Sequence, residues 1–535
     1  MPPFSNRSGE APVSTFNIGH FLTQNARRFG DHPGVVVSER TFTWLEVDRR
    51  VNRLANALVN AGIRAGDRIL VQARNSHRAF EVKWACFKLG AVWVPVNFRL
   101  TPAEVAYMTR HASARAIVFD GEFPQHCEAA RAELDPAPIS VCLDGPLEGS
   151  LVYEQLLADG DDSFVEADVE RDQPAWFFYT SGTTGRPKAA VLTHGQLAFV
   201  VASHLADMFP GTSEKDASLV ITPLSHGAGI HALAHVARSA PQIILTATSL
   251  DPETVWQTVA RHKVTNFFAV PTLLKTLVEH PSVDHHDRSS LRHVNYGGAP
   301  MFRSDQALAM AKLGNVLVQH YGLGEFTANI TVLSPGQHGL AEAGSPDHAV
   351  GSCGVPRTGV EVAILDADGR RLAVGETGEI CARGQAAFLG YHNDPDATAK
   401  AFRHGWFHTG DLGFLDERGF LHITGRASDM YISGGLNVYP REIEEVILDD
   451  ERIDEAAVVG MPHPKWGECG VAVVVAKAGC EIAAKDIIDG LNGRIARYKF
   501  PNQVVFWPEL PKSAYGKVLK REIIKRLAEE HERAA

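Results

Sequence analysis

The sequence of 535 residues has few cysteines, no long apolar run and no strongly basic segment. Its seven cysteines are odd in number, scattered and without a C-x-x-C pair, so we expect free thiols in a reducing cytoplasm rather than a disulfide framework. No apolar stretch reaches the roughly 18 residues of a membrane span, and the first residues lack the apolar centre of a secretory signal. These absences predict a cytoplasmic protein with no integral membrane association.

The charge balance also narrows the choice of partners. The chain has 52 basic and 63 acidic residues, a formal net charge of −11, and its basic residues form no stripe. We therefore expect no nucleic-acid partner. Hydrophobic residues make up 45% of the chain, which is typical of a globular protein, and the length predicts two or three domains.

The first half of the chain alternates strand and helix patterns. Thr43 and Glu46 form a capping-box pattern ahead of apolar residues at helical spacing, and Gly62 follows as a stop signal. Strands separated by amphipathic helices predict βαβ units and parallel sheet. The predicted strands cover 68–72, 91–96, 116–119, 175–179, 218–221, 266–270 and 316–321, with helices over 80–89 and 255–262.

The pattern changes after about residue 350. Segments 361–365 and 378–382 alternate with polar turns, which favours antiparallel hairpins. A polar joint at 424–429 then precedes a mixture of short helices and strands. The expected fold class is therefore α/β: a large N-terminal domain of βαβ layers with a β-rich subdomain, followed by a small α+β C-terminal domain.

One segment predicts the chemistry of the site. Residues 179–188 read Tyr-Thr-Ser-Gly-Thr-Thr-Gly-Arg-Pro-Lys and directly follow an apolar strand. Gly182 and Gly185 allow a tight turn with amides directed at a ligand, the hydroxyl side chains add donors, and Lys188 adds positive charge. The spacing is not that of a Walker A loop. The segment favours a polyphosphate site over a plain surface turn.

This loop and several motifs in the same order resemble the AMP-forming acyl-CoA synthetase family. That family lies within the adenylate-forming superfamily, which also holds peptide-synthetase adenylation domains and luciferases. The similarity covers nearly the whole chain. It implies an N-terminal domain over 1–426, a small mobile C-terminal domain over 427–535 and a site between them. Ser428 occupies the hinge position, where the family usually has Asp or Lys.

The resemblance also implies a nucleotide site. In the family the hydroxyl-rich loop holds the ATP phosphates, a Gly-Gly-Ala-Pro segment and a tyrosine lie against adenine, an aspartate binds both ribose hydroxyls, and an arginine reaches the ribose or α-phosphate. Taken singly, the Gly-Gly-Ala-Pro and Thr-Gly-Asp segments are also typical of plain turns. The matching residues are Thr180, Ser181, Gly182, Thr183, Thr184, Lys188, Gly298, Ala299, Pro300, Tyr321, Gly322, Asp411, Ile423 and Arg426.

A metal site is implied beside the phosphates. Glu325 matches the family glutamate that holds Mg²⁺, with Thr184 next to it, and a carboxylate suits this hard cation. Gly324 departs from the family, which usually has a threonine whose hydroxyl lies near the phosphate. We expect its absence to leave more room beside the acyl carboxylate.

Catalysis and CoA binding are assigned by similarity alone. Lys517, at the end of Leu-Pro-Lys-Ser-Ala-Tyr-Gly-Lys, matches the catalytic lysine, and His226 matches a histidine that borders the carboxylate and thiol channel. Ser433, Gly434 and Gly435 match the stretch along the pantetheine tunnel. Outside this context, a lone histidine is more often a core residue and a lysine near a chain end is usually solvated.

The acyl pocket is expected to be mostly apolar. Its predicted lining includes His231, Val270, Gly297 and Leu323, with no arginine for a second carboxylate. This favours an apolar monocarboxylic acid: a short-to-medium-chain fatty, thioether or aryl acid. His231 and His235 share one helix face, so a zinc site is a minor alternative to pocket lining.

Together these motifs imply an ATP-dependent acyl-CoA ligase with ATP, Mg²⁺ and CoA. It would form acyl-AMP, release pyrophosphate and transfer the acyl group to CoA. The main alternative is an adenylating enzyme that loads a carrier-protein thiol. A luciferase-like oxygenase and a non-enzymatic binding protein are weaker alternatives. We expect a monomer or homodimer.

Overall fold

The protein is represented by a computed structural model, which describes residues 16–158, 160–180, 186–246, 250–299, 301–338, 351–513 and 517–534. Five expected ATP-binding residues lie outside the described residues: Ser181, Gly182, Thr183, Thr184 and Pro300.

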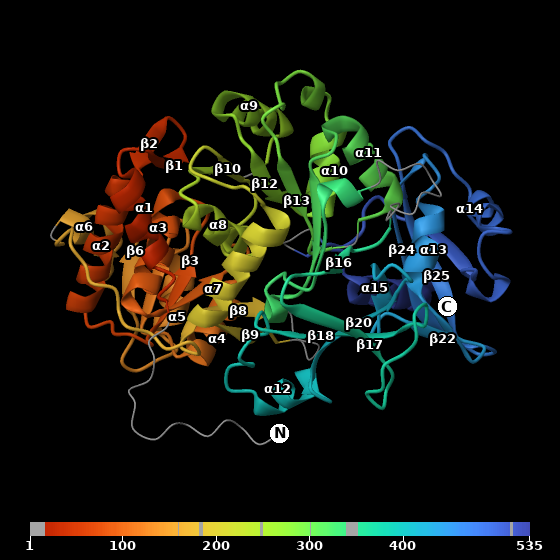
Figure 1. Ribbon diagram of the computed structural model, residues 1–535. Helices are drawn as coiled ribbons and strands as arrows, with labels where there is room; N and C mark the ends of the chain where they lie inside the picture. Colours follow the sequence, from red (N-terminus) through yellow and green to blue (C-terminus); the bar gives the residue numbers. More distant parts are fainter. Residues whose placement is uncertain are drawn as a thin grey trace.

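The first large sheet is parallel except for its last strand, β9. Figure 1 shows it beside a second large sheet. Its strands follow the order β7 (Leu151–Val152), β6 (Ile139–Cys142), β5 (Ala116–Phe119), β3 (Arg68–Gln72), β4 (Val92–Val96), β8 (Pro174–Thr180) and β9 (Lys188–Thr193).

The second sheet has a parallel centre and antiparallel strands at both edges. Its strands follow the order β16 (Val355–Pro356), β15 (Thr331–Leu333), β14 (Leu317–Tyr321), β13 (His293–Tyr296), β12 (Asn266–Ala269), β10 (Ser218–Val220), β11 (Gln242–Ile244), β1 (Pro33–Val37) and β2 (Arg40–Thr43).

Helices join the strands and connect the two sheets through one core. The capping box of α2 is formed as predicted, with the Thr43 hydroxyl and the Glu46 carboxylate each bonded to a backbone amide. Val51 on α2 and Leu233 on α8 share one buried cluster with Trp176 of the first sheet. The helices of this part are α1 (His20–Phe29), α2 (Trp44–Asn60), α3 (His77–Leu89), α4 (Pro102–Ala112), α5 (Pro124–Arg131), α6 (Tyr153–Ala158), α7 (His194–Ser203), α8 (Gly227–Ala237), α9 (Pro252–His262), α10 (Pro271–Glu279) and α11 (Arg303–Leu313).

A third, antiparallel sheet forms the predicted β-rich region and pairs β20 with both β18 and β21. The polar joint begins later than the predicted residue 424, because β21 continues its pairing with β20 as far as Arg426. The elements here are β17 (Val360–Leu365), β18 (Gly378–Gly384), α12 (Pro395–Ala401), β19 (Phe402–Arg403), β20 (Trp406–Leu415) and β21 (Leu421–Arg426).

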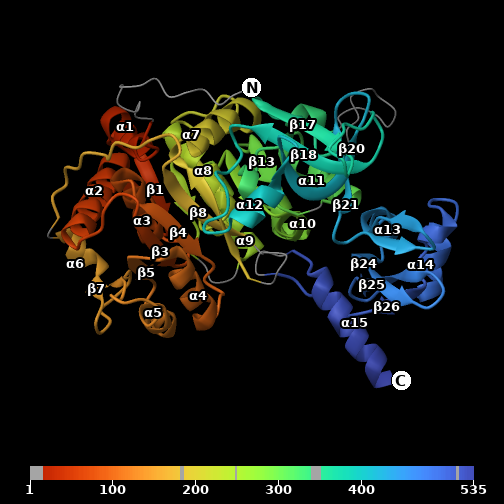
Figure 2. The same cartoon turned by 90° about the horizontal axis from the view of Figure 1, so that it is seen from below.

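The last part of the chain is a smaller domain with its own sheet and core. Its buried cluster contains Tyr431, Val458 and Leu491, and Phe302 packs against it from the larger part. Figure 2 shows this domain at one end of the molecule, close to β20 and β21. Its elements are β22 (Tyr431–Ser433), β23 (Leu436–Val438), α13 (Pro440–Ile447), β24 (Ile453–His463), β25 (Gly467–Ala476), α14 (Ala484–Leu491), β26 (Gln503–Phe506) and α15 (Lys520–Ala534).

The mixed α/β fold, with a large N-terminal domain and a smaller C-terminal domain, confirms the predicted fold class. Within the described ranges, none of the helices has the length and apolar character needed to cross a membrane.

Candidate active site

A cavity of about 250 Å³ lies between the larger and the smaller domain. The larger domain contributes the ends of β14 and β20, and the smaller domain contributes the segment before α15. The structure thus brings together residues that lie more than two hundred positions apart in the sequence. The predicted residues that line the cavity are Gly298, Ala299, Tyr321, Gly322, Leu323, Asp411, Ile423, Arg426 and Lys517.

A buried carboxylate at the cavity wall has both oxygens in use. The Tyr321 hydroxyl donates to Asp411 Oδ2 at 2.7 Å, and Arg426 Nε lies 3.1 Å from Oδ1. The pairing of β20 with β21 places Asp411 opposite Arg426, so the sheet itself fixes this ion pair. A carboxylate with two accepting oxygens beside an arginine suits a ligand that carries a cis-diol and a phosphate.

The backbone at 297–299 forms another part of this wall. A side chain at Gly297 would lie 2.6 Å from the His320 carbonyl oxygen, so only glycine fits against β14. Gly298 has a φ of +82°, and nothing lies within 4 Å of the point where its Cβ would stand. The chain therefore presents bare backbone to the cavity, which allows a flat ring to approach closely.

Glu325 is buried and fits the role of a metal ligand. Its Oε1 accepts hydrogen bonds from the Thr180 hydroxyl at 3.0 Å and the Tyr391 hydroxyl at 2.8 Å. Among the described residues, Oε2 receives no hydrogen bond, so one oxygen of an oriented carboxylate is available to a hard cation. Lys188 lies nearby, paired with Asp394 at 3.0 Å. No sequence motif indicated Tyr391 as a site residue.

Packing explains the departure at Gly324. A Cβ at this position would lie 2.6 Å from Phe178 Cδ1 and 3.0 Å from Thr180 Cγ2. The expectation of extra room is therefore wrong at this point, because the Phe178 ring occupies the space. That ring also contacts His226 in a tilted arrangement, with 4.6 Å between centroids. Phe178 was missed because, in the sequence, it is one more apolar residue of a buried strand.

Further aromatic rings and neutral histidines lie next to the nucleotide wall, which is the part of the cavity lining around Tyr321, Asp411 and Arg426. Burial lowers the pKa of His226 to about 4 and that of His320 to about 3, so both are neutral near pH 7. His231 lies between Phe268 and His320, at 4.8 and 5.0 Å between ring centroids. His320 also lines the cavity, so the contacts among Phe268, His231 and His320 reach the cavity wall.

The other predicted acyl-pocket residues lie in the same region. Leu323 lines the cavity, Gly297 packs on His320, and Val270 directly precedes α10. His231 adjoins a void of about 10 Å³, room for no more than about one water molecule. The zinc alternative gains no support, since His235 Nδ1 bonds to the His231 carbonyl at 2.9 Å and no third ligand joins them within the described chain.

Lys517 enters the cavity from the smaller domain. Burial lowers its pKa and Arg426 lowers it further, while Asp411 and Asp429 act in the opposite direction. Ser428 is exposed and its hydroxyl donates to Asp429 Oδ1 at 3.1 Å. The charge that the hinge position lacks is thus present one residue later, on a side chain that lines the cavity.

The hairpin with Ser433, Gly434 and Gly435 has a different position. It is not part of the cavity lining, and it pairs with the start of β25. Its surroundings expose large apolar side chains at Ile432, Leu436 and Trp466. The structure therefore presents Lys517, and not this hairpin, to the nucleotide wall.

Comparison with known proteins agrees with this geometry. The family described as AMP-binding enzyme matches residues 22–392, and its C-terminal domain, described as AMP-binding enzyme C-terminal domain, matches residues 442–517. The chain belongs to the AMP-binding enzyme family. The cavity of this AMP-binding enzyme lies between the two matched regions.

The similarity to relatives and to a solved structure extends over nearly the whole chain. A feruloyl-CoA synthase from Amycolatopsis sp is 34% identical, covering 95% of this chain and 99% of the relative. A fatty acid–[acyl-carrier-protein] ligase from Streptomyces coeruleorubidus is 32% identical, covering 92% of each chain. The crystal structure of ATP-bound MatB from Rhodopseudomonas palustris matches with a TM-score of 0.86 and 29% identity, covering 95% of this chain and 98% of that one.

Proposed function

We propose that this AMP-binding enzyme is an ATP-dependent acyl-CoA ligase that forms acyl-AMP and then an acyl-CoA thioester. The observation that carries the proposal is the single cavity in which Lys517 of the smaller domain faces Asp411 and Arg426 of the larger one. The cationic side chains and the ribose-type carboxylate converge where a nucleotide α-phosphate would meet a carboxylic acid.

In the first half-reaction, the substrate carboxylate attacks the α-phosphate of ATP and pyrophosphate leaves. Charge builds up on the α-phosphate oxygens in the transition state, and the Lys517 ammonium group and Arg426 stabilise it. Asp411 holds the ribose and keeps Arg426 oriented through the 3.1 Å ion pair. Glu325, with Thr184, would hold Mg²⁺, which supplies charge neutralisation at the phosphates when bound.

In the second half-reaction, the CoA thiolate attacks the acyl carbon and AMP leaves. The smaller domain is proposed to rotate about Ser428, which withdraws Lys517 and brings the Ser433–Gly435 hairpin to the acyl group. The exposed Ile432, Leu436 and Trp466 support this step, because they form an apolar face that the described part of the chain leaves exposed. Ser428→Pro should therefore slow thioester formation more than pyrophosphate release, measured separately in stopped assays.

For the acid, we propose an apolar monocarboxylate and, within that class, an aryl acid. This region contains five aromatic and imidazole rings: Phe178, His226, Phe268, His231 and His320. Their contacts are tilted or edge-on, with centroids 4.6 Å apart for Phe178 and His226, 4.8 Å for His231 and Phe268, 5.0 Å for His231 and His320, and 5.6 Å for Phe268 and His320. Flat rings favour a flat ligand. The buried guanidinium of Arg357 lies behind this surface, paired with Asp207, so it offers no counter-ion to a second carboxylate.

The test is pyrophosphate release with Mg-ATP and a panel of aryl, fatty and dicarboxylic acids, with and without CoA. An aryl acid that gives pyrophosphate and a CoA thioester supports the whole proposal. A fatty acid as the best substrate refutes the aryl assignment while keeping the reaction. Acyl-AMP that accumulates with CoA but is consumed by a carrier protein would favour carrier loading, and no pyrophosphate from any acid would refute the function.

We also propose that this enzyme acts in the cytoplasm. All seven cysteines are free thiols, and six of them are buried. Free thiols of this kind persist where the surroundings are reducing.

A further inference from the structure

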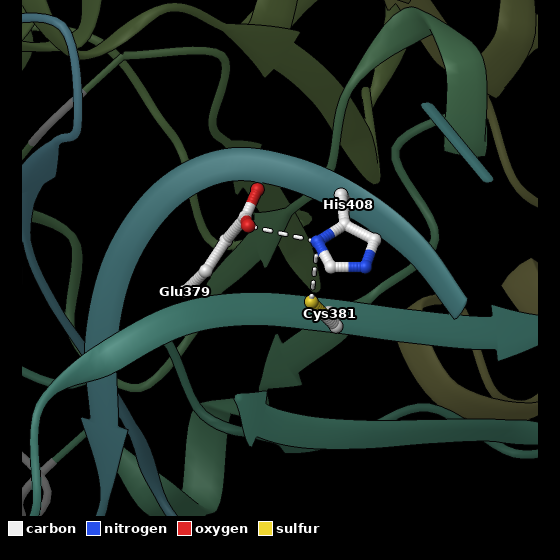
Figure 3. A group of neighbouring side chains, drawn as sticks. All are labelled: Glu379, Cys381 and His408. Carbon is white, nitrogen blue, oxygen red and sulfur yellow. Dashed lines mark hydrogen bonds and ion pairs between the residues drawn. The ribbon is translucent and has the colours of Figure 1, made fainter. Parts of the chain in front are cut away.

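Three side chains of different chemistry converge in the third sheet, away from the cavity lining. Figure 3 shows Glu379, Cys381 and His408 directed toward one another. His408 Nδ1 lies 2.7 Å from Glu379 Oε2 and 3.4 Å from Cys381 Sγ. Their ligand atoms all lie within 4.8 Å of one another, and no other such group of three occurs among the residues the structure describes.

Strand geometry fixes this arrangement. Glu379 and Cys381 are two residues apart on β18, so their side chains share one face of the sheet. Cys381 is directly opposite His408 on β20, and a shift of register on one side of this pair accommodates Glu379. The Cys381 thiol and His408 are buried, so the group is already assembled in the fold.

The His408 ring is oriented with Nδ1 toward the Glu379 carboxylate and the Cys381 thiol. Its Nε2 lies 3.2 Å from the Arg403 carbonyl oxygen, which can only accept, so Nε2 carries a hydrogen. Its Nδ1 faces Glu379 Oε2 at 2.7 Å and Cys381 Sγ at 3.4 Å, so a cation held there would have all three ligand atoms around it. Histidines that bind metals commonly donate their other ring N–H to such a carbonyl.

Arg403 shows that the group attracts positive charge. Its Nη2 lies 3.2 Å from Glu379 Oε2 and 3.1 Å from His408 Nδ1. The Arg403 side chain is half exposed, so it can turn into solvent. Its guanidinium and a metal ion would compete for the same two ligand atoms.

We propose that Glu379, Cys381 and His408 form a zinc site, with water as the fourth ligand and Arg403 displaced on binding. A thiolate, an imidazole nitrogen and a carboxylate oxygen make a ligand set typical of Zn²⁺, and a thiol is a poor ligand for Mg²⁺ or Ca²⁺. Binding releases the thiol proton to solvent, and no oxidation or reduction takes place.

The zinc site connects to the nucleotide wall through one carboxylate. Glu379 Oε1 accepts a hydrogen bond from the Gly410 amide at 3.1 Å, and Asp411 is the next residue. Gly410 has a φ of +74°, a backbone conformation that glycine adopts readily. If the proposed ligase function holds, zinc on Oε2 will change the KM for ATP and leave the KM for the acid unchanged.

The primary test measures metal binding, so its outcome does not depend on the proposed reaction. The full-length protein is stripped with EDTA and titrated with Co²⁺, followed by displacement with Zn²⁺. We expect one site per chain with a cobalt–thiolate charge-transfer absorption. Cys381→Ser should abolish that absorption and weaken Zn²⁺ binding by about 100-fold or more, while Cys480→Ser, which changes the exposed thiol, should leave both unchanged.

Arg403→Ala gives a second readout that does not remove a ligand. It should tighten Zn²⁺ binding, because the competing guanidinium is gone. If wild type shows no thiolate absorption, if the absorption survives Cys381→Ser, or if Arg403→Ala leaves the affinity unchanged or weaker, the zinc site is overturned and the group is an ion pair that supports the Gly410 turn.

Discussion

The proposed nucleotide side of the cavity and the proposed acyl pocket next to it are built by different kinds of contact. On the nucleotide side, Asp411 has each oxygen assigned to one partner, Tyr321 or Arg426, at fixed distance. In the proposed acyl pocket, Phe178, His226 and His231 contribute ring surfaces without charge, and His320 connects His231 to the cavity lining. A charged hydrogen bond needs one particular partner at one position, so a side chain that makes it is hard to replace. Ring surfaces instead select the shape of the ligand that fits against them. Changes on the first side should therefore affect every acid equally, and changes on the second should alter the preference among acids.

Lys517→Ala should have the largest effect. Removing one transition-state cation commonly costs about 10²–10³ in rate, and we expect at least that loss in acyl-AMP formation with every acid tested. Single-turnover pyrophosphate release measures it. Lys512→Ala is the matched control, because Lys512 is exposed and pairs with Glu455 instead. A rate close to wild type for Lys517→Ala would disprove its role.

Asp411→Asn should come next. The amide keeps the shape but loses the charge that pairs with Arg426, and a hydrogen bond to a charged group contributes about 1.5–3 kcal/mol. We expect the KM for ATP to rise roughly 10- to 100-fold, by the same factor for each acid. If the rise in the KM for ATP differs strongly from one acid to another, the proposed difference between the nucleotide side and the acyl side is contradicted.

Gly324→Thr tests the acyl side. Its new side chain must displace Phe178, whose ring lies 2.6 Å from the Cβ position, and such overpacking costs about 1–3 kcal/mol of unfolding free energy. Urea denaturation measures this loss. The double variant with Phe178→Leu should recover part of it, which gives a coupling energy for the pair. Simple additivity of the two single changes would contradict the packing explanation.

The pH dependence of stability should show the smallest effect. Burial lowers the pKa of His226 from 6.5 to about 4, so in this window the unfolded chain binds a proton that the folded chain excludes. The free energy of unfolding therefore falls as pH drops from 6.5 toward 4 and is regained as pH rises. In His226→Gln, the plot of unfolding free energy against pH should have a slope that is shallower by up to about 1.4 kcal/mol per pH unit. The exposed His285→Gln is the control, and equal slopes in the His226 variant and wild type would contradict the expectation.

The two sides also differ in how far the sequence predicts them. Local signals were sufficient for β3, whose predicted bounds are the observed ones, and for the capping box of α2. On the nucleotide side, polar residues in short motifs carry the information, so Tyr321, Asp411 and Lys517 were predicted and do converge.

The missed features depend on neighbours that are distant in the sequence. Phe178 fills the space at Gly324, and Tyr391 bonds to Glu325, only because separate strands and loops meet there. The Cys381–His408 contact depends on the register of β18 against β20. Tertiary packing and strand register create these contacts, and no local pattern in a single sequence specifies them.

The short turn after β21 connects the nucleotide wall to the proposed hinge at Ser428. The Arg426 carbonyl accepts hydrogen bonds from the Asp429 and Met430 amides, and the Ala427 amide bonds to the Gly410 carbonyl next to Asp411. The residues proposed to hold the nucleotide and the proposed hinge residue, Ser428, thus share one stretch of backbone. If the proposed function holds, occupancy of the nucleotide site sets the order in which the two chemical steps occur, and the enzyme needs no separate sensor to keep CoA waiting until an adenylate exists.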